Sequence, residues 1–122
     1  MAGGVTEQII GCAIAVHRAL GLGLLESAYE ECLCYELAEQ GLAFSRQAPM
    51  PVVYKGVKLD CGYRVDVIVA DTVLVEIKAV EDLLPIHEAQ LLTYLRLSQL
   101  RTGLLINFHT KILRDGIRRR VL

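Results

Sequence analysis

The residues best suited to chemistry in this sequence of 122 residues are two acids and a lysine within valine-rich segments. Asp66 lies in residues 63–69, and Glu76 and Lys78 lie in residues 72–80; both segments have the alternating pattern of β-strands. If a three-residue loop joins these segments as a hairpin, Asp66 lies directly opposite Glu76. Their Cβ atoms would then be about 4.5–5.5 Å apart on one face of the sheet.

Two carboxylates at this separation repel each other, and low-dielectric surroundings strengthen the repulsion. A divalent cation would relieve it, because carboxylate oxygens are the ligands that Mg²⁺ and Mn²⁺ prefer. Lys78 falls on the same face, two residues beyond Glu76, where its ammonium group could orient a water molecule or neutralise charge on a phosphate. The alternative is an ordinary solvated sheet face that carries an Asp, a Glu and a Lys.

The residues around these strands indicate the helices that must support them. The apolar spacing predicts a helix over residues 6–20, with Thr6 as its N-cap, and a second helix over residues 25–40 that ends at Gly41. A third helix is predicted over residues 85–100, because its first residue is a proline.

The remaining segments are predicted as strands, and they cover residues 44–54, 57–61, 63–69, 72–80, 102–108 and 116–122. Pro49 and Pro51 indicate that the first of them is an edge or irregular strand. The chain has no internal repeat and no linker. This order predicts one α/β domain over residues 1–122, in which one layer of helices packs on a mixed central sheet.

Residues 23–29, Asp66 and the Glu76-Ile77-Lys78 stretch follow one another along the chain. In this order they resemble the motifs of the PD-(D/E)XK nuclease superfamily and, within it, of the GxxExxY family. Asp66 followed by Glu76-Ile77-Lys78 is similar to the superfamily motif, although Val65 stands in place of the proline. Gly23-Leu24-Leu25-Glu26-Ser27-Ala28-Tyr29 matches the GxxExxY motif. The likeness includes the Leu-Pro-Ile-His-Glu-Ala-Gln-Leu-Leu-Thr-Tyr stretch and the Leu-Leu-Ile-Asn-Phe strand, and so covers almost the whole chain. It implies a restriction-endonuclease-like core, a mixed central sheet flanked by helices.

The resemblance also implies a role for each matching residue. Asp66 and Glu76 would be metal ligands, with the Ile77 carbonyl as a further oxygen ligand, and Lys78 would be the catalytic lysine. Glu26 would be the additional acid that many superfamily nucleases place beside the metal. The alternative for Glu26 is an acid that stabilises the first turn of its helix by about 0.3–1 kcal/mol.

Further candidates lie in the GxxExxY motif and in the third predicted helix. Tyr29, from the motif, is predicted to support the site. Gln90 and Tyr94 are four residues apart, which places them on one helix face with His87 one turn earlier. The superfamily often has such a Gln-x-x-x-Tyr element beside the active site, so Gln90 is a catalytic candidate, and Tyr94 and His87 are supporting ones. The alternative is an amphipathic helix with a partly buried polar seam, above all for His87.

The formal net charge of −1 excludes a basic protein that coats nucleic acid. The charge is nevertheless uneven: residues 1–40 have one base and six acids, whereas residues 96–122 have seven bases and one acid. A chain with such a basic end can hold a polyanion locally. The candidates for nucleic-acid contact are Lys55, Lys58, Arg118 and Arg120, while Arg119 would face away from its two arginine neighbours.

Composition sets the remaining expectations. No apolar run reaches the roughly 18 residues of a membrane span, and no export signal is recognisable, so we expect a cytoplasmic protein with no membrane contact. The four cysteines are then expected as reduced core thiols, without a zinc site. The apolar fraction of 53% and the mean hydropathy of +0.40 are high for this size, which predicts a homodimer.

Together these features predict a Mg²⁺- or Mn²⁺-dependent nuclease that hydrolyses phosphodiester bonds in nucleic acid, with DNA as the expected substrate, in repair, recombination or defence. The alternative is a catalytically silent domain with a nuclease fold that binds nucleic acid or another protein. A working site is favoured by the Asp66, Glu76 and Lys78 set, since a silent domain has no need of apposed carboxylates.

Overall fold

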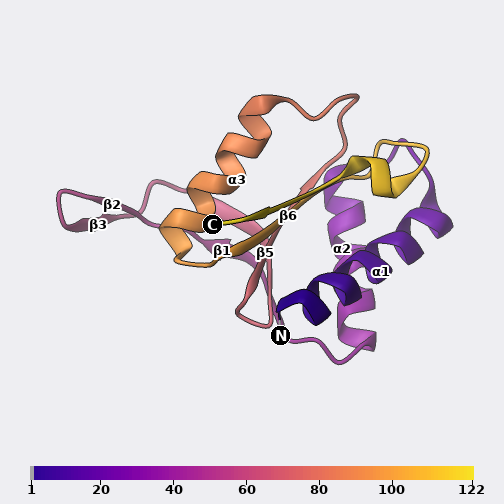
Figure 1. Ribbon diagram of the computed structural model, residues 1–122, viewed down its shortest axis with the longest axis horizontal. Helices are drawn as coiled ribbons and strands as arrows, with labels where there is room; N and C mark the ends of the chain where they lie inside the picture. Colours follow the sequence, from indigo (N-terminus) through magenta and orange to yellow (C-terminus); the bar gives the residue numbers. More distant parts are fainter. Residues whose placement is uncertain (1) are drawn as a thin grey trace.

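A mixed five-stranded sheet in the order β1-β4-β5-β6-β7 forms the centre of the computed structural model, which describes residues 2–122 (Figure 1). Its helices are α1 (Ala2–Leu20), α2 (Glu26–Glu39), α3 (Pro85–Ser98) and the short 3₁₀ helix η1 (Leu113–Gly116). The sheet strands are β1 (Phe44–Pro49), β4 (Arg64–Val69), β5 (Val73–Lys78), β6 (Thr102–Asn107) and β7 (Ile117–Val121). Among the strands of residues 2–122, only β5 and β6 pair in parallel, because α3 connects them as a crossover.

Helices cover both faces of the sheet, so the prediction of one helical layer is wrong. One buried cluster joins α1 and α2 to side chains such as Val67, Val75 and Ile106. A second cluster on the opposite face joins Leu91 and Leu95 of α3 to the strands. Figure 1 shows α3 well separated from the α1–α2 pair. The prediction of a mixed sheet flanked by helices is confirmed.

The ends of α1 and α2 show how local chemistry sets the helix boundaries. α1 begins at Ala2, so Thr6 is a buried residue inside the helix, and its prediction as the N-cap is wrong. The reason is that the apolar stripe extends backward to Val5, which packs against the core. α2 ends as predicted at Gly41, whose φ of +73° allows the Gly41 and Leu42 N–H groups to bond the carbonyls of the last turn.

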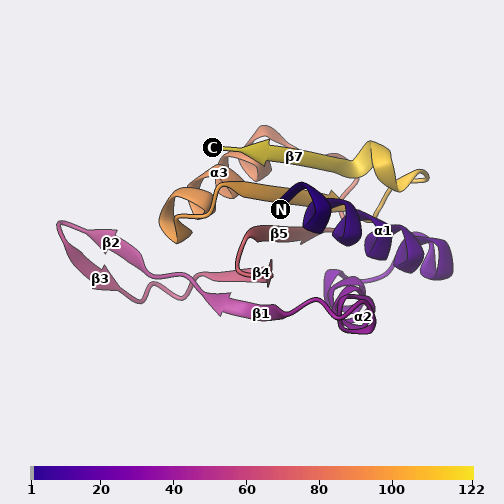
Figure 2. The same cartoon turned by 60° about the horizontal axis from the view of Figure 1, so that its bottom comes forward.

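The predicted strand over residues 44–54 is interrupted between Pro49 and Val52. β1 is an edge strand of the sheet, as its prolines indicated, and Met50 after it turns into the core. The chain then leaves the sheet as a hairpin of β2 (Val52–Tyr54) and β3 (Val57–Leu59). This hairpin, which we call the arm, projects beyond the rest of the molecule in Figures 1 and 2.

No helix within residues 2–122 is long and apolar enough to cross a membrane.

The four cysteines are free thiols. Cys12 and Cys34 are buried and Cys32 is half-buried, whereas Cys61 is exposed at the base of the arm. The prediction of a core position is therefore wrong for Cys61, because it follows β3 in the segment that connects the arm to the sheet.

Candidate active site

Asp66 and Glu76 face each other where β4 and β5 separate. The two strands pair in the predicted register, with Val67 opposite Val75 as the last pair of the ladder. Beyond that pair, carboxylates take the place of backbone acceptors. The Asp66 N–H donates to Glu76 Oε1 at 3.1 Å, and the Ile77 N–H donates to Asp66 Oδ2 at 2.8 Å. The two acids are thus fixed side by side by the backbone of the strands that carry them.

This pair of acids lies in an environment that opposes negative charge. The Glu76 side chain is buried, with 8% of the residue exposed, and Asp66 is half-buried. Burial, and then the charge of Asp66, raise the pKa of Glu76 to about 8. Burial also raises the pKa of Asp66 against the opposing effect of the Ile77 N–H. The positive charge of Lys78 lowers both pKa values but does not compensate the pair.

The donor atoms at this point fit a hard divalent cation. Two carboxylates are adjacent, and the Ile77 carbonyl faces the same way as its N–H, toward Asp66. The negative charges of Asp66 and Glu76 are buried, and Lys78 does not fully neutralise them. A bound cation would therefore stabilise this carboxylate pair. No cluster of three or more His, Cys, Asp or Glu side chains suited to a metal ion exists among the described residues, so the remaining ligands would be backbone, water or substrate oxygens.

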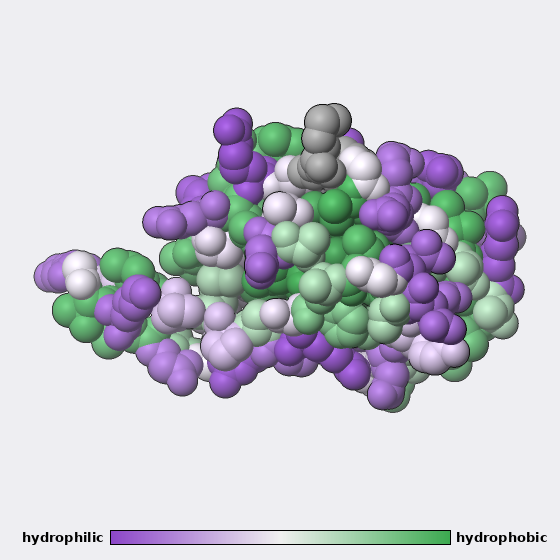
Figure 3. All heavy atoms as spheres, turned by 90° about the horizontal axis from the view of Figure 1, so that it is seen from below, coloured by the Kyte–Doolittle hydropathy of each residue, from purple (hydrophilic) through white to green (hydrophobic). Residues whose placement is uncertain are grey.

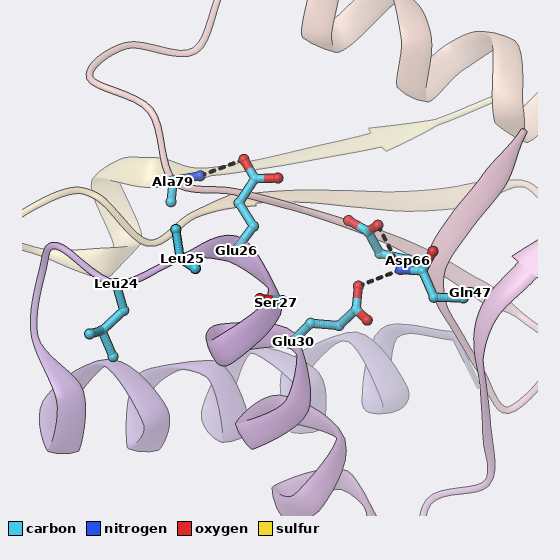
Figure 4. A pocket seen from close by; sticks show the side chains of 8 residues that line it. All are labelled: Leu24, Leu25, Glu26, Ser27, Glu30, Gln47, Asp66 and Ala79. Atoms are coloured by element: carbon cyan, nitrogen blue, oxygen red, sulfur yellow. Dashed lines mark hydrogen bonds between the residues drawn. The ribbon is translucent and has the colours of Figure 1, made fainter.

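Glu26 reaches the same region from the start of α2. Its carboxylate accepts a hydrogen bond from the Ala79 N–H at 3.0 Å, directly after the end of β5 (Figure 4). Tyr29 is fully buried and supports the preceding loop: its hydroxyl donates to the Gly21 carbonyl and accepts from the Leu24 N–H, while its ring stacks on Phe108 at 4.6 Å. Gly23 in this loop has a φ of +95°. Gly23 and Tyr29 of the motif therefore shape the loop that positions the third motif residue, Glu26.

The structure adds a group of residues that the sequence did not indicate. Glu30, one turn after Glu26, is buried and forms an ion pair with Arg46 at 2.6 Å between Oε2 and Nε. The Gln47 amide nitrogen donates to Glu30 Oε1 at 2.8 Å and to Asp66 Oδ1 at 3.3 Å. Gln47 has a φ of +53° in the middle of β1, a conformation that costs energy in a side-chain-bearing residue. The α2 and β1 elements are thereby connected to the metal-ligand candidate Asp66.

These side chains border a pocket of about 590 Å³ that opens beside α2. We call it the acidic pocket; it is lined by Leu24, Leu25, Glu26, Ser27, Glu30, Gln47, Asp66 and Ala79. Figure 4 shows Glu26, Glu30 and Asp66 around it, with Gln47 between the last two. The pocket therefore places open space against the acidic groups.

The candidates of α3 lie apart from the acidic pocket. Gln90 is exposed and lines a second, more apolar groove. Tyr94 also lines this groove. Burial, and then the negative charge of Glu76, raise the pKa of the Tyr94 hydroxyl. His87 accepts the Leu84 N–H at Nδ1, 3.0 Å away, and so caps the start of α3. This contact favours the structural alternative for His87.

The basic candidates are spread over two regions. Lys55 and Lys58 belong to the arm, where the Lys55 ammonium lies 5.4 Å from the centre of the Tyr54 ring. In β7, Arg120 forms an ion pair with Glu88 of α3, and Arg118 donates to the carbonyls of Asp115 and Ile117. Pairing with Glu88 leaves less of the Arg120 charge for a phosphate.

Comparison with known proteins gives one match. A family model described as the PD-(D/E)XK nuclease superfamily matches residues 4–120. No curated protein and no solved structure matches the chain. The matched range contains the sheet strands except for the last residue of β7, and it contains both carboxylates that face each other across β4 and β5.

Proposed function

Because the chain belongs to the PD-(D/E)XK nuclease superfamily, we propose that it is a nuclease that uses Mg²⁺ or Mn²⁺ to hydrolyse phosphodiester bonds in DNA. The observation that carries this proposal is the Asp66 and Glu76 carboxylate pair, which backbone N–H groups hold together and of which Asp66 lines the acidic pocket. We also propose that the chain belongs to the GxxExxY family, because Gly23, Glu26 and Tyr29 have the spacing of that motif.

Asp66, Glu76 and the Ile77 carbonyl would hold the cation, with Glu26 beside them. When bound, the cation would polarise the scissile phosphate and lower the pKa of the attacking water. In the hydrolysis, the water oxygen forms a bond to phosphorus and the bond from phosphorus to the leaving sugar oxygen breaks. One proton of the water passes to Glu26, and the leaving oxygen takes up a proton from solvent.

Lys78 and Glu26 act directly on the reacting groups in this proposal. The Lys78 side chain alternates onto the face of Glu76, where its ammonium group donates hydrogen bonds to a phosphate oxygen and stabilises the charge that develops there. Glu26 is exposed at the pocket and accepts the Ala79 N–H with one oxygen, which leaves the other oxygen to accept a proton of the water.

The test is cleavage of DNA by conservative variants of the two opposed acids. We expect Asp66→Asn and Glu76→Gln each to lower Mg²⁺-dependent cleavage by at least about 100-fold, since each removes a charge that the cation needs. Asp71→Asn is the matched control, because Asp71 lies exposed in the turn of the same hairpin, outside the site. Cleavage by the Asp66 and Glu76 variants at the wild-type rate would refute the site. RNA substrates in the same assay test the choice of DNA.

A catalytically silent binding domain is the competing function. Calorimetric titration with Mn²⁺ separates the two, since a working site binds the cation saturably and the Glu76→Gln variant loses that binding. A wild-type protein without saturable binding would favour the silent domain.

We also propose a homodimer in the cytoplasm, where free thiols such as the exposed Cys61 stay reduced.

A further inference from the structure

A second groove of about 330 Å³ lies between the base of the arm and α3. Its lining includes Val52 and Tyr63 from the arm side and Ile86, Thr93, Tyr94 and Leu97 from α3. Tyr63 and Tyr94 stand 6.1 Å apart with their rings tilted by 59°, and Tyr63 is 48% exposed. The groove therefore presents aromatic surface that the protein itself does not cover.

This groove lies beside the two strands that carry the acidic pair. Tyr63 directly precedes β4, and Asp66 follows on the same strand. Tyr94 packs against the buried cluster that contains Leu74 of β5, the strand that carries Glu76. A chain lying in the groove would thus lie beside the two strands that carry the carboxylates of the proposed site.

The arm adds positive charge and further exposed rings. Residues 52–59, which form the arm, contain two bases, Lys55 and Lys58, and no acid; Asp60 follows them, and its carboxylate accepts the Gly62 N–H. This stretch is positive although the whole chain has a net charge of −1. Tyr54 is 59% exposed near its tip. In Figure 3 the arm protrudes as a lobe on which hydrophobic and hydrophilic side chains are interspersed.

We propose that the arm and this groove bind a single-stranded segment of the nucleic acid substrate, with unpaired bases on Tyr63 and Tyr94 and phosphates on Lys55 and Lys58. This inference rests on the proposed nuclease function and names its substrate class. Base stacking on aromatic side chains beside a basic track is how proteins hold single strands without reading their sequence. A continuous duplex encloses its base faces within the stack and offers only phosphates and groove edges, so it would leave the rings unused.

Fluorescence anisotropy with labelled DNA in EDTA measures this binding without cleavage. The probes are an oligothymidine of about 16 nucleotides, within the site size of known single-strand binders, and a duplex of the same length. We expect the wild type to bind the single strand more tightly than the duplex. Tyr63→Leu, which keeps an apolar side chain, should weaken single-strand binding by about 5- to 100-fold through loss of stacking. Tyr35→Leu is the matched control, because Tyr35 is 66% exposed on α2 and outside the groove.

A second variant keeps the test independent of packing at the base of the arm. Lys55→Gln combined with Lys58→Gln leaves the apolar contacts intact and should reduce the salt slope of single-strand binding by about 1.4, or 0.7 for each phosphate contact. Equal or tighter binding of the duplex, or unchanged single-strand binding by both the Tyr63 and the lysine variants, would overturn the inference. The nuclease function fails separately, if the wild type cleaves neither probe with Mg²⁺ or Mn²⁺.

Discussion

At the residue scale, alternation along two strands was enough to predict the central acids, but not the residues around them. The assumed three-residue loop gave the correct hairpin register, and this register places Asp66 opposite Glu76. Glu30 could have been found, since it lies four residues after Glu26 and hence on the same helix face. Gln47 could not, because glutamine is not a residue that favours positive φ, and only the folded strand shows its two contacts.

The position of Gln47 leads to a prediction that separates its contacts from its backbone strain. Gln47→Ala removes the bridge between Glu30 and Asp66 and keeps the unfavourable φ, whereas Gln47→Gly removes both. We expect both variants to lose about 10- to 100-fold in Mn²⁺ affinity, as for partners that orient metal ligands. Thermal unfolding should show the glycine variant to be more stable than the alanine variant by about 1 kcal/mol. Wild-type Mn²⁺ affinity in both would show that Gln47 does not orient Asp66.

Glu76 gives a prediction about pH. Its pKa is about 8 in the folded protein and 4.5 in the reference state, so between these values the metal-free folded state retains a proton that the unfolded chain has released. The free energy of unfolding contributed by Glu76 is therefore greatest below about pH 4.5 and falls as the pH rises toward 8. In EDTA, unfolding measured across this range should show a decline that Glu76→Gln reduces. At pH 8, Mg²⁺ should restore stability to the wild type and not to the variant. A profile identical in both proteins would contradict this account.

At the element scale, helix and strand periodicity predicted the order of elements along the chain, while contacts distant in sequence decided where the elements stop. The arm leaves the sheet because Met50 is buried and its N–H bonds the Tyr63 carbonyl, which closes the hairpin at its base. The end of β5 is held by Asn107, whose side-chain amide bonds both the N–H and the carbonyl of Val80. No local sequence pattern predicts the contact of Met50 with Tyr63 or that of Asn107 with Val80.

The loop before α2 provides the prediction at this scale. Tyr29→Phe keeps the stacking on Phe108 and removes the hydroxyl that bonds the Gly21 carbonyl and the Leu24 N–H. We expect a loss of about 1–2 kcal/mol in unfolding free energy, because the loop loses two hydrogen bonds at one buried hydroxyl. Since this loop positions Glu26, kcat for DNA cleavage should fall as well, by more than the fraction of unfolded protein explains. Tyr35→Phe, an exposed tyrosine on the same helix, is the control in both measurements. Stability lost with kcat unchanged would limit Tyr29 to a structural role.

At the scale of the whole molecule, the error about helix layers has a physical explanation. β5 and β6 are buried along nearly their whole length, which means that neither strand has a solvated face. Their near-continuous apolar sequence, typical of strands covered on both sides, was evidence for two layers of helices. Gly103 in β6 shows how close the second layer lies: a Cβ there would stand 3.0 Å from a Leu91 methyl carbon. The two-sided core accounts for much of the apolar fraction of 53%.

The apolar surface that remains exposed supports the homodimer and makes it testable. Outside the arm, large side chains such as Leu25, at 77%, and Ile112, at 63%, still face solvent. Burial of such apolar surface between two copies would stabilise a dimer. Salt would not weaken this stabilisation, because it does not depend on charges. Sedimentation at micromolar concentration should therefore give twice the chain mass of 13.5 kDa, both in dilute buffer and near 1 M NaCl. Since the arm is assigned to nucleic acid, the dimer should persist in the Lys55→Gln, Lys58→Gln double variant. A single species of 13.5 kDa would refute the dimer and leave the exposed apolar residues to another partner.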